Sequence, residues 1–194
     1  MDPEEDDTPD GVHDGLMNDS INGSANIDPT HLVLGGRAPS PDDLPRLAWT
    51  RAVMAESMRL RPPAWTLERS VQEDFEVGGY RIRKGAIVLL PQFFVHRDPR
   101  WWGDDAEHFD PGRWLTEGQA ARPKFAYFPF GAGTRICVAE HFAWMEGTLV
   151  LAEIARRWRM LYEQPEPPVL EPLVTLRPKG GLRMRLVRRG EGHG

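Results

Sequence analysis

The sequence predicts an α+β fold that is mainly helical and contains small antiparallel β-sheets. Three observations lead to this expectation. Apolar residues recur at spacings of three and four over residues 42–61 and again over residues 138–158, as in helices. Apolar and polar residues alternate on both sides of a glycine pair at residues 78–79, as in a hairpin. Alternation returns near the carboxyl terminus, over residues 182–186.

The 194-residue chain is long enough for one domain with a sizeable core. Its single cysteine excludes an internal disulfide framework and fits a reducing compartment, so we expect a cytoplasmic protein. No run of about 18 apolar residues occurs, and the amino terminus lacks the pattern of a secretory signal. We therefore expect no transmembrane segment.

Residues 1–30 form an acidic head, which holds nine of the 29 acidic residues and no Lys or Arg. The head is poor in large apolar groups and cannot bury enough surface to offset the entropy lost on ordering. We therefore expect it to be disordered, either as a tail that binds a basic partner or as a solvated tail or remnant. The globular part is expected over residues 31–194.

The first helix is expected to begin at Asp42 and Asp43, whose charges suit a helix amino terminus, with Pro45 in the first turn. Pro62 and Pro63 end it. Apolar side chains occupy both sides of this helix, which is typical of a buried helix.

Glu56 interrupts an apolar stripe of this helix that includes Val53 and Leu60. A buried carboxylate without a partner would be very costly, and Arg59 lies three residues away on the same helix. We therefore expect a buried ion pair between Glu56 and Arg59, with an ordinary surface pair as the alternative. Such a pair serves architecture more plausibly than chemistry.

Short strands are expected after the helix. Phe75–Val77 and Tyr80–Ile82 alternate around the two glycines and predict a hairpin. Ile87–Leu90 is expected to be a short buried strand. The following segment has neither period and predicts a compact, irregular region, in which His96 and His108 have no ligand-spaced partner for a metal.

The only cysteine, Cys137, follows a loop with Gly131 and Gly133 and precedes the second long helix. At a helix amino terminus, free backbone N–H groups and the macrodipole favour a thiolate, which binds metals or attacks electrophiles. The glycines let the backbone approach a flat ligand closely. Arg135 offers a cationic fork suited to carboxylates.

Three roles of Cys137 are open at this point. A buried structural thiol would not need the glycine loop. A nucleophile would need a base, and His141 lies four residues further on. An axial ligand of haem iron would need a thiolate, a close-approach loop and a cation for a propionate, and all three are present.

The run FGAGTRICVA, residues 130–139, resembles the haem-binding signature of the cytochrome P-450 family. Residues 56–59 are similar to the family's E-x-x-R motif, and residues 109–114 to its meander motif. The resemblance extends over residues of about 31–187, so the expected fold is the C-terminal portion of the cytochrome P-450 fold. Ala139 stands where the signature has glycine, a change that we expect to be tolerated.

The resemblance implies haem b as the cofactor, with Cys137 as the axial thiolate ligand of the iron. It assigns Arg135 and Arg69 to the haem propionates and Phe130 to packing beside the thiolate. It also implies a buried structural triad and a set of substrate-lining residues. The triad is Glu56, Arg59 and Arg113. The substrate-lining residues are Ala64, Trp65, Thr66 and Thr175.

Members of that family bind O2, take two electrons from a ferredoxin or reductase, and insert one oxygen atom into a small organic substrate. The resemblance therefore implies a redox partner on the proximal face, with Arg122 and Lys124 as candidate contacts, and no nucleic-acid partner. The family's oxygen-activating helix has no counterpart in residues 1–55, so we assign no catalytic residue. Two hypotheses follow: a fragment of a working monooxygenase, and a truncated, non-catalytic remnant.

Overall fold

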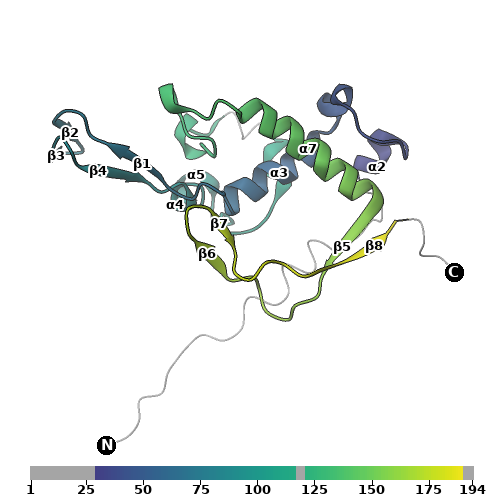
Figure 1. Ribbon diagram of the computed structural model, residues 1–194. Coiled ribbons are helices and arrows are strands. Elements are labelled where there is room, and N and C mark those ends of the chain that lie inside the picture. Colours follow the sequence, from purple (N-terminus) through teal and green to yellow (C-terminus); the bar gives the residue numbers. More distant parts are fainter. Residues whose placement is uncertain (1–28, 117–120, 190–194) are drawn as a thin grey trace, which may run out of the picture.

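The computed structural model describes residues 29–116 and 121–189. The acidic head expected over residues 1–30 lies almost entirely outside the described residues. Within them the fold is α+β, with helices and small antiparallel sheets, as the sequence predicts (Figure 1). The two longest helices, α3 (Ala48–Leu60) and α7 (Glu140–Arg157), pack against each other at the centre of the molecule.

Helix α3 begins later than expected, because a separate 3-10 turn, η1 (Pro41–Arg46), precedes it. The buried Asp43 carboxylate accepts a hydrogen bond of 2.9 Å from the Ser40 N–H and so closes the start of this turn. Pro45 has no N–H to extend a helical ladder, and Leu47, at φ −86° and ψ 37°, departs from helical geometry. The prediction of one continuous helix was therefore wrong.

A small core forms where α7 meets the amino-terminal elements. Leu34 of α2 (Pro29–Leu34), Leu47 and Ala152 are buried in contact with one another, and Leu149 packs against them. These contacts anchor the middle of α7.

Gly147 allows α7 to lie close to α3. A Cβ atom at this position would be 2.4 Å from Met54 Cε and 2.6 Å from Met54 Sδ. Any larger residue would therefore have to displace the Met54 side chain.

Both helices are less buried than their apolar residues predicted. Trp144, Thr148 and Ala152 of α7 are buried, but Phe142 is 58% exposed. In α3, Trp49 is likewise exposed. The described residues therefore leave part of each helix exposed, although most of α3 is buried or half-buried, as expected.

Two antiparallel ladders form an arm that projects from the helices (Figure 1). Strand β1 (Leu67–Ser70) pairs with β4 (Ile87–Leu90), and β2 (Phe75–Val77) pairs with β3 (Tyr80–Ile82). Both glycines between β2 and β3 have positive φ, so the expected hairpin and its glycine turn are confirmed. The predicted strand β4 is also present, but most of its residues are exposed.

Two further ladders lie towards the carboxyl terminus. Strand β5 (Trp158–Tyr162) pairs with β8 (Met184–Arg188), and β6 (Leu170–Pro172) pairs with β7 (Leu176–Pro178). The alternation at the end of the chain thus falls in β8, although Leu182 precedes the strand.

Short helical turns connect these elements and carry many of the site residues. They are α4 (Gln92–Val95), α5 (Pro99–Trp102), η2 (Pro111–Trp114), η3 (Lys124–Ala126) and η4 (Gly133–Arg135).

Candidate functional site

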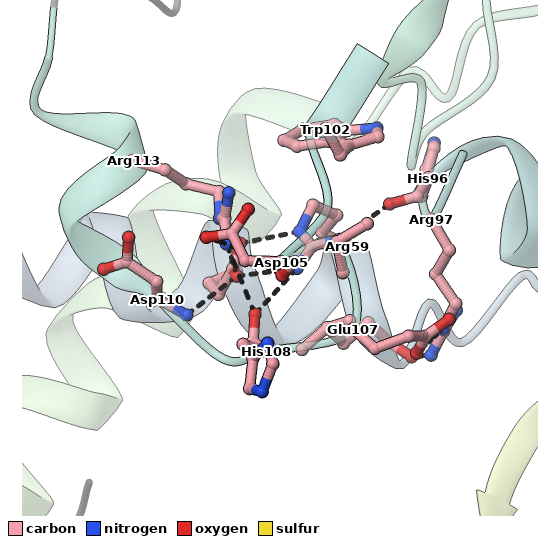
Figure 2. A network of polar contacts seen from close by, with 12 residues as sticks. Arg59, His96, Arg97, Trp102, Asp105, Glu107, His108, Asp110 and Arg113 are labelled. Atoms are coloured by element: carbon pink, nitrogen blue, oxygen red, sulfur yellow. Dashed lines mark hydrogen bonds and ion pairs between the residues drawn. The ribbon is translucent and has the colours of Figure 1, made fainter. Parts of the chain in front are cut away.

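A buried carboxylate organises the polar network shown in Figure 2. Glu56 on α3 is fully buried, and it accepts hydrogen bonds from Arg59 Nε and Nη2, both at 2.8 Å, and from Arg113 Nε at 3.1 Å. The Asp110 N–H and the Trp114 Nε1 donate to the same carboxylate, each at 2.9 Å. The structure therefore brings Glu56, Arg59 and Arg113 into direct contact.

These contacts keep the Glu56 carboxylate charged. Burial by itself raises the pKa of Glu56, but the hydrogen bonds from Arg59 and from the Asp110 N–H outweigh it, so this pKa lies below its usual value. Burial lowers the pKa of Arg113, whereas Asp105 and Glu56 raise it, and the net direction is upward. The ion pairs are therefore maintained at neutral pH.

Arg59 also holds the backbone on both sides of α5. Its Nη1 donates to the carbonyl oxygens of His96 and Ala106, at 2.8 and 2.6 Å, and its Nη2 donates to the His108 carbonyl at 3.1 Å. Figure 2 shows Arg59 between Arg113 and His96. One side chain thus satisfies three backbone carbonyls that have no partner from regular structure.

We call residues 128–137 the cysteine loop. Its first turn is closed by the Gly131 N–H, which donates to the Phe128 carbonyl at 2.9 Å. The Cys137 N–H donates to the Phe130 carbonyl at 3.0 Å and closes the loop. Gly131 has φ +79°, a left-handed conformation that strains any residue with a Cβ atom. The loop therefore depends on glycine at this position.

Cys137 is exposed and lies just before α7, where the sequence placed it. The Glu140 N–H at the start of α7 donates to the Cys137 carbonyl at 3.2 Å. His141, in the first turn, is exposed, and no hydrogen bond in the described structure joins its ring to Cys137. A nucleophilic thiol paired with His141 is therefore not what this geometry favours.

Exposed apolar side chains flank Cys137. Val138 is 99% exposed, Ile136 is about half exposed, and Phe142 projects from the first turn of α7. A flat apolar group over the cysteine loop would remove this surface from water, which is favourable.

Phe130 and Arg135 complete the loop. The Phe130 ring packs edge-to-face on Trp144, with 5.6 Å between centroids, so helix α7 holds the ring in place. Arg135 in η4 is exposed and free to reach a carboxylate. The residues of the loop therefore fit a flat, apolar group that carries acidic substituents and needs a thiolate ligand.

Arg69 belongs to a strand that lies against the cysteine loop. A Cβ atom on Gly131 would be 3.5 Å from Leu67 Cδ1, so β1 contacts the loop. Arg69 lies two residues after Leu67 and therefore on the same face of β1. Arg69 and Arg135, both expected to bind haem propionates, therefore lie on elements that contact each other.

The two segments expected to line a substrate pocket are hydrogen-bonded to each other. Trp65 Nε1 donates to the Leu173 carbonyl at 2.8 Å, and the Leu176 N–H donates to the Pro63 carbonyl at 2.9 Å. The loop that contains Thr175 is therefore held against the segment that contains Trp65.

The other two residues of this set, Ala64 and Thr66, are half-buried. The Thr66 hydroxyl oxygen is buried and has no hydrogen-bond partner among the described residues. It is available to a hydrogen-bonding group of a bound molecule.

Arg122 is used inside the protein. Its guanidinium lies 4.5 Å from the Trp102 ring centroid, and its Nη2 donates to the Arg113 carbonyl at 3.2 Å. Of the two cations considered for a partner surface, Lys124 is the exposed one.

Gln92 and His96 are site residues that the sequence analysis missed. Gln92 Nε2 donates to the Phe128 carbonyl at 2.8 Å, and His96 Nε2 accepts from the Phe128 N–H at 2.9 Å. The two residues of each pair are 36 and 32 positions apart in sequence, so the spacing of neighbouring residues could not predict these contacts.

The described residues contain no group of three or more His, Cys, Asp or Glu side chains placed to hold a metal ion. A single axial thiolate does not require such a group. In the same residues, no helix is both long and apolar enough to cross a membrane.

Comparisons with known proteins point in the same direction as this geometry. The profile of the family described as cytochrome P450 matches residues 30–184. Cytochrome P450 132 of Mycobacterium tuberculosis is 42% identical over 152 residues, which cover 78% of this chain and 32% of that protein.

Two relatives from Streptomyces are named for their activities. Cyclooctatin synthase of Streptomyces melanosporofaciens is 46% identical over 128 residues, 66% of this chain and 28% of the relative. Pentalenene oxygenase of Streptomyces avermitilis is 36% identical over 160 residues, 82% of this chain and 35% of the relative. The chain thus spans about a third of the length of the relatives that it matches.

Proposed function

The chain belongs to the cytochrome P450 family, and from this premise we propose that it forms the haem-proximal part of a haem-thiolate monooxygenase. In this proposal the Cys137 thiolate is the axial ligand of haem b. One observation carries the proposal: a single short loop combines an exposed thiol, a turn that needs glycine and exposed apolar side chains.

The cysteine loop and β1 supply the groups that would hold haem. Arg135 and Arg69 would pair with the propionates, because a guanidinium fork matches a carboxylate. Phe130, fixed on Trp144, would shield the thiolate from water. A thiolate-ligated haem supplies the chemistry of O–O bond cleavage. The chain's own residues orient the thiolate and bind the carboxylates.

Substrate and electron donor follow from the same proposal. A small organic substrate would contact the paired segments that contain Trp65 and Thr175, with the Thr66 hydroxyl available to a polar group. The name of one relative, pentalenene oxygenase, supports an oxygenation reaction. A ferredoxin or reductase would dock on the proximal face, where Lys124 is exposed.

A non-catalytic remnant is the second candidate. Such a remnant would bind haem weakly or not at all, so haem binding separates the two candidates experimentally.

Haem titration of the full chain, followed by reduction and CO addition, tests the proposal. We expect the wild type and a Thr134→Ser control to show the red-shifted Soret band of a thiolate-ligated haem–CO complex, and Cys137→Ser to lack it. Arg135→Gln should weaken haem binding by about tenfold or more, since a hydrogen bond to a charged group contributes ~1.5–3 kcal/mol. A Cys137→Ser spectrum that is the same as the wild-type spectrum would refute Cys137 as the iron ligand. A wild-type chain that takes up no haem would favour the non-catalytic remnant.

A further inference from the structure

We propose that His96 is a positioning residue that ties the cysteine loop to the Glu56–Arg59–Arg113 network. This proposal deepens the proposed function. Only the measurements on the haem-loaded chain rest on the proposed function. It stands on the contacts of His96 itself, which link two parts of the molecule through one residue.

The first contact is with the cysteine loop. His96 Nε2 accepts the Phe128 N–H at 2.9 Å, and one helical turn earlier Gln92 Nε2 donates to the Phe128 carbonyl at 2.8 Å. Both backbone groups of Phe128 are thus held by side chains from α4 and its end. We call the two contacts of Gln92 and His96 with Phe128 the clamp. The same Phe128 carbonyl also accepts the Gly131 N–H at 2.9 Å, so the clamp acts directly on the first turn of the loop.

The second contact is with the buried ion network. The backbone carbonyl of His96 accepts a hydrogen bond of 2.8 Å from Arg59 Nη1, a contact visible in Figure 2. Arg59 is in turn paired with Glu56 on the same helix. The path from the network to the loop therefore runs through the backbone of His96 on one side and its ring on the other.

The ring is fully buried and has little freedom to move. It packs against Tyr127, with 5.0 Å between centroids, and edge-to-face on Phe128, with 5.2 Å. Because Nε2 accepts a hydrogen bond from the Phe128 N–H, the ring's own proton is on Nδ1, which has no partner among the described residues. The geometry accepts only this neutral tautomer.

The electrostatic surroundings keep the ring neutral. Burial, with the positive charges of Arg59 and Arg97, lowers the pKa of His96 to about 3. A protonated ring would present a second N–H to the Phe128 N–H and open the clamp. At neutral pH the His96 ring is therefore a fixed hydrogen-bond acceptor. By holding Phe128 it positions the cysteine loop, which ends at Cys137.

Two variants separate the acceptor from the bulk of the ring. The side-chain oxygen of His96→Gln reaches the place of Nε2, whereas that of His96→Asn reaches only the place of Nδ1. His108→Asn is the matched control, because the His108 ring is exposed and only its backbone carbonyl serves the network. All three substitutions leave the backbone bond from Arg59 to residue 96 in place.

Amide hydrogen exchange of the full chain without haem is the deciding measurement. We expect amides of residues 128–137 to exchange about tenfold faster in His96→Asn, which corresponds to ~1.4 kcal/mol, since one hydrogen bond is lost and a buried N–H is left unpaired. His96→Gln should stay close to the wild type, and His108→Asn should match it. Equal exchange in the Gln and Asn variants, or an equal rise in the distant β2–β3 hairpin, would overturn the proposal.

In the haem-loaded chain, His96→Asn should shift the iron midpoint potential and broaden the CO Soret band, and His96→Gln should restore both. A potential that is equal in the two variants would also overturn the proposal, provided that Cys137→Ser shows the iron to be thiolate-ligated. If the spectrum of Cys137→Ser is instead the same as that of the wild type, the proposed function fails, and the exchange data alone decide whether His96 positions the loop.

Discussion

A Glu56→Gln substitution keeps the shape of the side chain at the centre of the ion network and removes its charge. In the wild type this carboxylate is fully buried and accepts five hydrogen bonds, three of them from the guanidinium groups of Arg59 and Arg113. In the variant both cations lose their shared counterion, and the new amide N–H faces donors instead of acceptors.

The expected cost is large. Removing one partner of a buried ion pair destabilises a protein by ~3–5 kcal/mol, out of a total stability of ~5–15 kcal/mol. With a urea m-value of ~2 kcal/mol per molar, the midpoint should fall by about 2 M. Trp102 and Trp114 border the network, so tryptophan fluorescence reports the transition. Glu153→Gln, which weakens a partly exposed ion cluster on α7, is the control and should shift the midpoint far less.

The pH dependence follows from the same carboxylate. Its folded pKa is lower than the unfolded value of about 4.5, so it contributes stability that is complete above that pH and is lost as the pH falls towards the folded pKa. Glu56→Gln should therefore remove part of the acid sensitivity of the wild type. A midpoint shift no larger than that of Glu153→Gln, with unchanged acid sensitivity, would refute the reasoning.

Three further substitutions test other parts of the account. Gly147→Ile should destabilise the chain by ~1–3 kcal/mol in urea unfolding, because its side chain would overlap Met54, and adding Met54→Ala should recover part of the loss; no recovery would mean that this contact is not the cause. Gly131→Ala should cost ~1–2 kcal/mol at φ +79°, which lowers Tm by about 2–4 °C per kcal/mol, and an unchanged Tm would contradict the strained turn. Trp65→Phe should speed amide exchange in the loop of Leu173 without moving the urea midpoint, and equal exchange would show that the indole bond does not order that loop.

Local periodicity was enough to predict the elements whose residues contact near neighbours. The hairpin at β2 and β3 and the helix α7 fall where the spacing and the glycine turn placed them. The Glu56–Arg59 pair, one helical turn apart, was visible in the sequence for the same reason. Arg113, 57 residues from Glu56, came only from the resemblance to the family's motifs.

Features that depend on tertiary contacts could not be predicted from spacing. The break between η1 and α3 depends on a buried Asp43, which also pairs with Arg37. The clamp on Phe128 joins side chains of α4 and residue 96 to a backbone more than thirty residues away. Phe142 is exposed because the described residues leave most of it uncovered, and the spacing of apolar residues along a helix does not predict which of them will be covered.

The central claim is a bond between haem iron and the sulfur of Cys137. Iron-edge X-ray absorption of the haem-loaded chain measures it directly, because sulfur scatters differently from nitrogen and oxygen. We expect one sulfur neighbour of the iron in the wild type and none in Cys137→Ser. A wild-type spectrum that requires only nitrogen and oxygen ligands would contradict the account.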